Sequence, residues 1–199
     1  MAYTKIDRFI AWMRFRAAYP HIRSGSRVCD LGCGLETAFL DYAVDRISSG
    51  VGVDDQLRED AQSRWQRVRT DLRSPLPFPA GHFDHVVMLA VLEHLTEPEP
   101  VLREAHRVLA PGGSLILTWP ATAVDPILGV MRGLRLISDE MESDEHQKRI
   151  PVETLRQMLE EIGFRKFLHE RFEFGLNNLM VATKESSCRI STDTSHPDS

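Results

Sequence analysis

From residue 27 onward, short strand-like segments alternate with amphipathic helix-like segments, and this alternation constrains the fold more than any other feature. The run 84–90 is almost entirely apolar, which predicts a central strand that is covered on both faces. The predicted strands are 27–31, 51–54, 65–70, 84–90, 114–119, 166–174 and 178–183, and the predicted helices are 5–18, 37–47, 100–109 and 151–162. Such an alternation predicts a three-layer α/β fold in which helices cover both faces of a mostly parallel sheet.

The last two predicted strands differ from the others in their connection. Only residues 175–177 separate them, whereas a parallel connection needs a crossover of about a dozen residues or more. We therefore expect an antiparallel hairpin at the end of the sheet.

Length and composition narrow the class of protein. The chain has 199 residues, the length of one domain, and a net charge of −5, which argues against a general nucleic-acid-binding protein. Its cysteines, Cys29, Cys33 and Cys188, are too few for a disulfide framework and fit a reducing compartment. No apolar run approaches the ~18 residues of a membrane span. These features predict a cytoplasmic protein, and the polar residues 185–199 are predicted to form a disordered tail.

A glycine turn follows the first predicted strand, in the stretch Asp30-Leu31-Gly32-Cys33-Gly34. Glycines adopt positive φ and let the backbone approach a ligand closely. Asp54 follows Gly34 by 20 residues, the separation at which an acid at the second strand can bond a ribose diol. An acid before the first glycine suits a cationic ligand group, so a nucleoside that carries an amino acid fits better than a dinucleotide. The alternative is a plain tight turn between strand and helix.

Further polar residues follow the other predicted strands. Asp71 comes after the third strand, and Leu89, Glu93 and His94 come after the fourth. Ligands of open α/β sheets bind beyond the carboxyl ends of the strands. We therefore expect these residues to share one rim of the sheet with the glycine turn.

Five motifs in order resemble the class I S-adenosylmethionine-dependent methyltransferases, in particular their broad small-molecule ("type 11"-like) group. They are 28–34 (VCDLGCG), 50–54 (GVGVD), 70–79 (TDL, then PLPFP), 83–95 (FDHVVMLAVLEHL) and 103–115 (REAHRVLAPGGSL). The resemblance covers about residues 24–184. It implies a Rossmann-like sandwich whose seven strands lie in the order 3-2-1-4-5-7-6, with strand 7 antiparallel.

The same resemblance implies S-adenosylmethionine as the cofactor, with the glycines under its methionine part. Asp30 would hold its amino group, Asp54 would bond the ribose hydroxyls, and Asp71 would accept from the adenine amino group. The predicted cofactor-binding residues are Asp30, Gly32, Cys33, Gly34, Asp54, Asp71, Leu72 and Leu89.

Two positions depart from the family pattern. Glu36 stands where the family usually has a third glycine, so it either serves the start of the next helix or weakens the cofactor site. Some relatives bind a divalent ion through E-x-x-E-H, but here Ala90 occupies the first position, and no metal site is expected. Glu93 and His94 then either cap and pack the following helix or act at the methyl-transfer face.

The acceptor is expected to be recognised outside the motifs, by an N-terminal helical cap (1–23) and by a lid formed from 120–150. Trp12 and Phe15 of the cap can either cover the sheet or touch a membrane surface, with Arg14 and Arg16 pointing outward. His146 and His94 are the candidate catalytic residues, because imidazole can deprotonate an acceptor near neutral pH.

Together, the single domain 1–184 is predicted to be an enzyme that methylates an O, N or C atom of a small-molecule or lipid- or sugar-linked acceptor. The acidic charge and the lack of an N/D-P-P-Y/F motif disfavour nucleic acid as a partner. A non-catalytic relative that binds a protein partner is the alternative, with Glu36 as its only support. A nicotinamide-dependent oxidoreductase is disfavoured, because the glycine spacing differs and no Tyr-x-x-x-Lys pair is present. The oligomeric state is left open.

Overall fold

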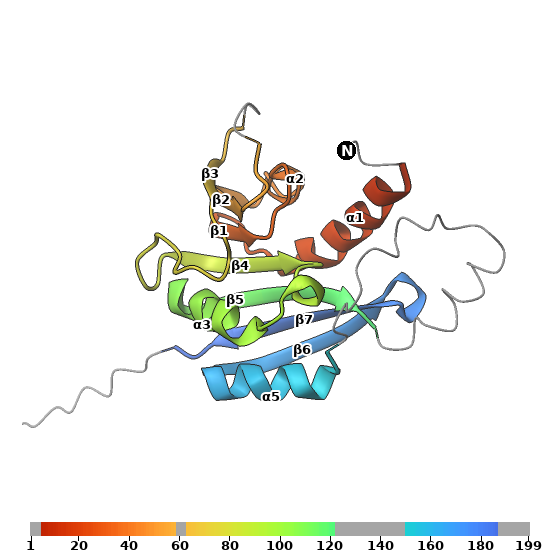
Figure 1. The fold of residues 1–199 in the computed structure, drawn as a ribbon, viewed down its shortest axis with the longest axis vertical. Helices are drawn as coiled ribbons and strands as arrows, with labels where there is room; N and C mark the ends of the chain where they lie inside the picture. The colour runs from red at the N-terminus through yellow and green to blue at the C-terminus, as the bar shows by residue number, and fades with distance from the viewer. Residues whose placement is uncertain (1–4, 59–62, 122–149, 187–199) are drawn as a thin grey trace, which may run out of the picture.

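The computed structural model of the protein describes residues 5–58, 63–121 and 150–186 (Figure 1). The helices are α1 (Lys5–Ala18), α2 (Ala38–Tyr42), α3 (Pro98–Val108) and α5 (Val152–Ile162), with short 3-10 helices η1 (Tyr19–His21), η2 (Leu92–His94) and η5 (Glu173–Gly175). The strands are β1 (Ser26–Leu31), β2 (Ile47–Asp54), β3 (Gln66–Arg69), β4 (Phe83–Leu89), β5 (Leu109–Pro120), β6 (Phe164–Phe172) and β7 (Asn177–Lys184).

The seven strands form one sheet in the order β3-β2-β1-β4-β5-β7-β6. Strands β1 to β5 pair in parallel, whereas β7 runs antiparallel to both of its neighbours. The predicted sheet order and the antiparallel final hairpin are therefore confirmed, and β3 lies at an edge.

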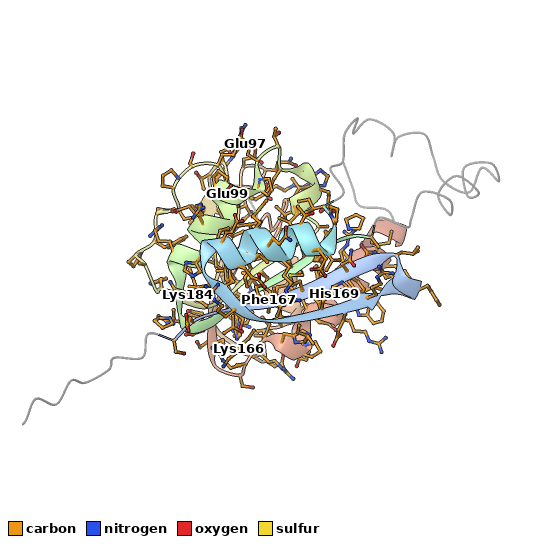
Figure 2. The ribbon with its side chains drawn as sticks, turned by 90° about the horizontal axis from the view of Figure 1, so that it is seen from below. Glu97, Glu99, Lys166, Phe167, His169 and Lys184 are labelled. Atoms are coloured by element: carbon orange, nitrogen blue, oxygen red, sulfur yellow. The ribbon has the colours of Figure 1, made fainter. Side chains whose placement is uncertain are left out.

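Helices cover both faces of the sheet, as the alternation predicts. On β4, Val86 and Met88 pack into the core that α3 and α5 complete, while Val87 packs into the second core with residues of α1 and α2. Alternate β4 side chains point to opposite faces, so a strand buried on both faces needs an unbroken apolar run. Figure 2 shows α5 running alongside β6, the strand that carries Phe167 and His169.

Several predicted segments have different bounds in the structure, and two of the differences have a clear physical reason or consequence. The helix expected over 37–47 is wrong beyond residue 42, because Ile47 is the first residue of β2 and pairs with Ser26 of β1. A β-branched residue followed by two serines gains more from the sheet than from the helix. The strand expected over 114–119 is also longer and begins at Leu109, directly after α3 ends.

Helix α1 does not present the faces that its spacing predicts. Phe15 packs against Phe39 and Tyr42 of α2, with ring centroids 5.6 and 5.8 Å away. Phe9 is 58% exposed and stacks on Trp12, which is 40% exposed. The prediction that Arg14 points outward is wrong, because its Nε atom is shielded from solvent. Arg14 lies four residues before Ala18, which is fully buried, so both lie on one helix face.

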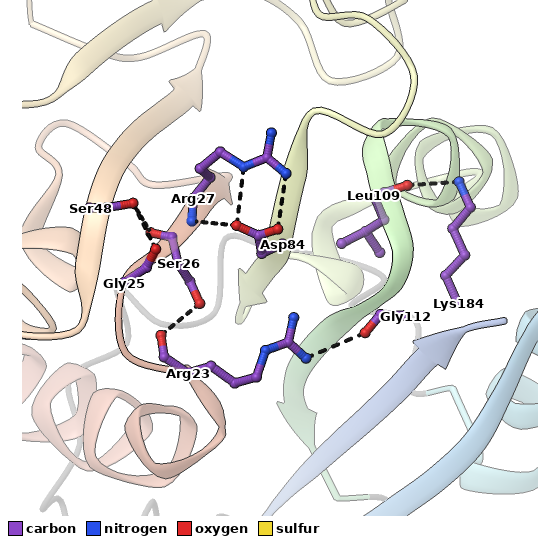
Figure 3. A network of polar contacts seen from close by, with 9 residues as sticks. All are labelled: Arg23, Gly25, Ser26, Arg27, Ser48, Asp84, Leu109, Gly112 and Lys184. Atoms are coloured by element: carbon purple, nitrogen blue, oxygen red, sulfur yellow. Dashed lines mark hydrogen bonds and ion pairs between the residues drawn. The ribbon is translucent and has the colours of Figure 1, made fainter. Parts of the chain in front are cut away.

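Polar contacts fasten the strands at the end of the sheet opposite the rim where β1 and β4 finish (Figure 3). Arg27 donates from its backbone N–H and its Nε to Asp84 Oδ2, at 2.9 and 3.1 Å, and so joins β1 to β4. Arg23 Nη1 donates to the Gly112 carbonyl at 3.3 Å, and Lys184 Nζ donates to the Leu109 carbonyl at 2.7 Å. This end is therefore a scaffold, and the candidate site lies at the opposite rim.

Replacing Arg107 with methionine is expected to lower the free energy of unfolding by about 1–3 kcal/mol, because two carbonyls lose a charged donor. Arg107 donates to the Phe78 and Leu76 carbonyls at 2.7 and 3.0 Å and ties the loop after β3 to α3. Urea denaturation measures the change. Arg103→Met on the same helix removes an exposed ion pair to Glu99 and should change stability by less than about 0.5 kcal/mol. Equal effects of the two variants on the free energy of unfolding would contradict this role of Arg107.

Candidate functional site

The glycine turn after β1 has the backbone that its sequence predicts. Gly32 and Gly34 have φ of +77° and +74°. The Gly32 N–H donates to the Val53 carbonyl at 2.8 Å, so the turn is bonded to the end of β2. An added Cβ on Gly32 would lie 2.4 Å from Val91 Cγ2. The turn is thus held between β2 and the segment that follows β4.

Asp54, the last residue of β2, fixes the turn further. Its Oδ2 accepts from the Gly34 N–H and its Oδ1 accepts from the Gln56 N–H, both at 2.8 Å. Each carboxylate oxygen keeps a second lone pair for a ligand. Asp54 is therefore bonded to the glycine turn, and its bonds to a ribose stay a prediction.

Asp30 lies beneath the same turn and is 3% exposed. Burial, with a contribution from the charge of Asp54, raises the pKa of Asp30 to about 7. Burial and the charges of Asp30 and Asp54 also raise the pKa of Cys33, so its thiol is not a nucleophile at neutral pH. Two carboxyl groups close to one buried turn favour a cationic ligand group, because a positive charge there stabilises both.

Asp71 stands at the same rim but is held by Arg73. Its carboxylate accepts from Arg73 Nε at 3.0 Å and from the Arg73 backbone N–H at 2.9 Å, and this partner lowers the pKa of Asp71 to about 2. Asp55 is affected by Asp54 at the turn and by Asp71. Its burial, then Asp54 and then the charge of Asp71 raise the pKa of Asp55. Asp55 was not among the predicted site residues, although its place directly after Asp54 was a usable signal.

Leu72 and Leu89, the two apolar members of the predicted set, are partly buried. Leu72 packs against the core that α3 and α5 complete, and Leu89 packs against the second core at the end of β4. Both lie on segments that follow or end strands at the rim. Their predicted backbone contacts with the cofactor stay predictions.

Glu36 is exposed, and its φ is not positive, so the missing third glycine leaves no strained backbone. Its carboxylate lies 4.0 Å from Arg58 Nη1. Glu36 therefore forms an ion pair with Arg58, which follows β2. The described residues show no distortion of the glycine turn by Glu36.

The segment after β4 brings Glu93 and His94 to the rim with different exposures. Ala90 has φ of +59°, and its N–H donates to the Thr118 carbonyl and to Thr118 Oγ1, at 3.0 and 3.1 Å. Glu93 is only 7% exposed, whereas His94 is exposed. The second predicted catalytic residue, His146, lies outside the described residues, as do 122–149 of the predicted lid and 187–199 of the predicted tail.

Sheet order, glycine turn and rim carboxylates define a class I S-adenosylmethionine-dependent methyltransferase. The chain belongs to the methyltransferase domain family, whose model matches residues 4–169. It is an enzyme, and S-adenosylmethionine is its cofactor.

Individual relatives support the same class. The chain is 25% identical over 193 residues to the ubiquinone/menaquinone biosynthesis C-methyltransferase UbiE of Ectopseudomonas mendocina, covering 83% of this chain and 75% of that one. It is 33% identical over 106 residues to the 27-O-demethylrifamycin SV methyltransferase of Amycolatopsis mediterranei, covering 48% and 39% of the two chains. A crystal structure of a methyltransferase from Archaeoglobus fulgidus has the same fold, with a TM-score of 0.69, 20% identity and 89% and 94% of the chains covered. Within the described part of the chain, no helix is long and apolar enough to cross a membrane.

Proposed function

We propose that the enzyme methylates a small molecule that carries a hydroxyl group on a ring or an enol. Two relatives support a small-molecule acceptor, because one is named as a C-methyltransferase of ubiquinone/menaquinone biosynthesis and the other as a methyltransferase of 27-O-demethylrifamycin SV. The net charge of the whole chain is −5, which favours a small acceptor over a polyanion.

The observation that carries the cofactor assignment is the buried Asp30 beside Asp54 at the glycine turn. Asp30 would hold the ammonium group of the methionine part, and the free lone pairs of Asp54 would accept from ribose hydroxyls. Asp71 and the Leu72 backbone would face the adenine. S-adenosylmethionine supplies a methyl group whose bond to a positively charged sulfur breaks with the electron pair left on sulfur.

The chain itself has to hold the acceptor in line and to remove its proton. In-line positioning at about 3–3.5 Å provides much of the rate of such a transfer. His94 and His146 are the candidates for the proton acceptor that the sequence predicts, and the buried Glu93 next to His94 is a third. The roles of 1–23 as a cap and of 120–150 as a lid stay predictions.

Asp54→Asn is expected to weaken S-adenosylmethionine binding by about 10- to 100-fold, because one charged acceptor for the ribose is lost. Calorimetric titration of the wild type and the variant measures the change. Asp84→Asn, at the opposite end of β4, should bind the cofactor as the wild type does. No binding of S-adenosylmethionine to the wild type at millimolar concentration would refute the proposed function.

A further inference from the structure

Four polar side chains near the rim are buried in part or in full and have an atom without a hydrogen-bond partner. The atoms are Arg14 Nε, Glu93 Oε2, Glu173 Oε1 and Asn177 Oδ1. The residues come from α1, η2, η5 and β7, and we call them the inner cluster. Glu93 and Asn177 are each 7% exposed.

Charge effects and one hydrogen bond link the four residues of the inner cluster. The charge of Arg14 acts on the carboxyl groups of both Glu93 and Glu173. Asn177 donates from Nδ2 to Glu173 Oε2, and it pairs with Pro120 at the carboxyl end of β5. Figure 1 shows α1 and the turn between β6 and β7 at the same end of the sheet. The inner cluster therefore lies at the carboxyl rim.

The inner cluster is also joined to the glycine turn. Val91, whose side chain lies against Gly32, precedes Glu93 by two residues. Between β4 and Glu93, Ala90 is held at φ +59°, and Glu173 and Phe174 of η5 have φ of +52° and +56°. Backbone in this region costs about 1–3 kcal/mol per residue, and such residues gather at functional sites.

Polar atoms without partners make the inner cluster energetically costly. Each buried polar atom without a hydrogen-bond partner costs the folded state about 1–3 kcal/mol, and a charged atom costs more. The four atoms comprise one donor, Arg14 Nε, and three acceptors, which are two carboxylate oxygens and one amide oxygen. A hydroxyl group matches this pattern, because it donates one hydrogen and accepts another.

We propose that the inner cluster binds the hydroxyl group of the methyl acceptor, which donates to Glu93 Oε2 and accepts from Arg14 Nε. This inference rests on the proposed function and names its acceptor site. The hydroxyl proton moves to the Glu93 carboxylate, and the negative charge left on oxygen is stabilised by the guanidinium of Arg14. The oxygen, or the ring carbon that receives its electron pair, then attacks the methyl group, and S-adenosylhomocysteine leaves with the electron pair of the broken sulfur–carbon bond. After attack through carbon, that carbon loses its proton to solvent and the oxygen regains one from Glu93. Glu173, held by Asn177, places a second negative charge near Arg14.

The surroundings of Glu93 suit proton transfer. Burial raises its pKa, which the charges of Arg14 and His94 partly oppose. A carboxylate with a raised pKa is a stronger base than an exposed one, and it is better matched to a phenolic proton. Glu97, four residues further along the chain, is exposed and offers a matched control (Figure 2).

The test uses 2-methyl-1,4-naphthoquinol, kept under argon, and its dimethyl ether as probes. Each is titrated by calorimetry into the full-length enzyme saturated with S-adenosylhomocysteine. We expect the quinol to bind the wild type and the Glu97→Gln variant at least tenfold more tightly than the ether does. In Glu93→Gln and Arg14→Met, this preference should fall to about twofold or less. Arg14→Lys replaces Arg14→Met if the methionine variant fails to fold.

The outcomes separate this inference from the proposed function. Unchanged S-adenosylhomocysteine affinity in the variants shows that they are folded and that the cofactor site is intact. Quinol that does not bind the wild type at millimolar concentration, or that binds no better than the ether, overturns the inference alone. An equal preference in wild type, Glu93→Gln and Arg14→Met also overturns it. Failure of the wild type to bind S-adenosylhomocysteine overturns the proposed function.

Discussion

Asp30→Asn is expected to stabilise the unliganded enzyme above pH 7 and to weaken S-adenosylmethionine binding at least tenfold. Burial, and then the charge of Asp54, raises the pKa of Asp30 to about 7 from its ordinary value of 3.8. The ionised carboxylate is thus unfavourable in the folded protein until a cation reaches it. Asparagine removes that unfavourable charge and, with it, the charge that would hold the ammonium group of the cofactor.

The sign follows from proton linkage. A group whose pKa is higher in the folded state binds its proton more tightly there, so the wild type loses stability as the pH rises from about 4 to about 7. Above pH 7 the loss is complete and amounts to about 4 kcal/mol at most. The gain of the variant should therefore be absent near pH 4, grow toward pH 7 and stay constant above it. Hydrogen bonds that the new amide fails to make reduce the gain by about 1–3 kcal/mol.

Urea denaturation of both proteins at pH 5, 6, 7 and 8 measures this profile. Asp84→Asn is the matched control, because hydrogen bonds from Arg27 lower the pKa of Asp84. Loss of this stabilised carboxylate should therefore destabilise the protein at pH 8. Cofactor affinity of the wild type should rise with pH up to about 7, since Asp30 must lose its proton to bind a cation. A gain in stability that does not depend on pH would refute the assigned pKa.

The sheet was predictable because its signals are local. An apolar run such as 84–90 is buried on both faces wherever it pairs, and a glycine turn with an acid before it forms from neighbouring residues. The bounds of α2 and β2 were not predictable in the same way. Ile47 joins the sheet because Ser26 lies opposite it, and that pairing belongs to the tertiary structure.

The cofactor rim and the inner cluster also differ in how far apart their residues lie in the sequence. The cofactor rim could be predicted, since Asp30, the two glycines and Asp54 lie within 25 residues of one another. The inner cluster could not, because Arg14 and Glu173 are brought together only by the fold. Glu93 was a candidate from its motif, but the sequence did not indicate that Arg14 lies near it. Arg14 gave one usable signal, its spacing of four residues from Ala18, which is buried.

Gly32→Ala is expected to lower the free energy of unfolding by about 2–5 kcal/mol and to abolish measurable cofactor binding. Alanine at φ +77° costs about 1–2 kcal/mol. The added Cβ would also lie 2.4 Å from Val91 Cγ2, and such overpacking costs about 1–3 kcal/mol more. Because Val91 leads to Glu93, its displacement moves one wall of the inner cluster together with the glycine turn.

Gly25→Ala separates the two causes. Gly25 has φ of +75°, nearly that of Gly32, but nothing lies within 4 Å of an added Cβ. It should therefore show the backbone cost alone and bind S-adenosylmethionine as the wild type does. Val91→Ala in the Gly32→Ala background removes the clashing methyl groups, so the double variant should recover part of the stability. If Gly25→Ala and Gly32→Ala are equally destabilised, and the Val91 change recovers nothing, the contact between the turn and the segment after β4 carries no energy. Cofactor binding would then depend on the turn without support from Val91.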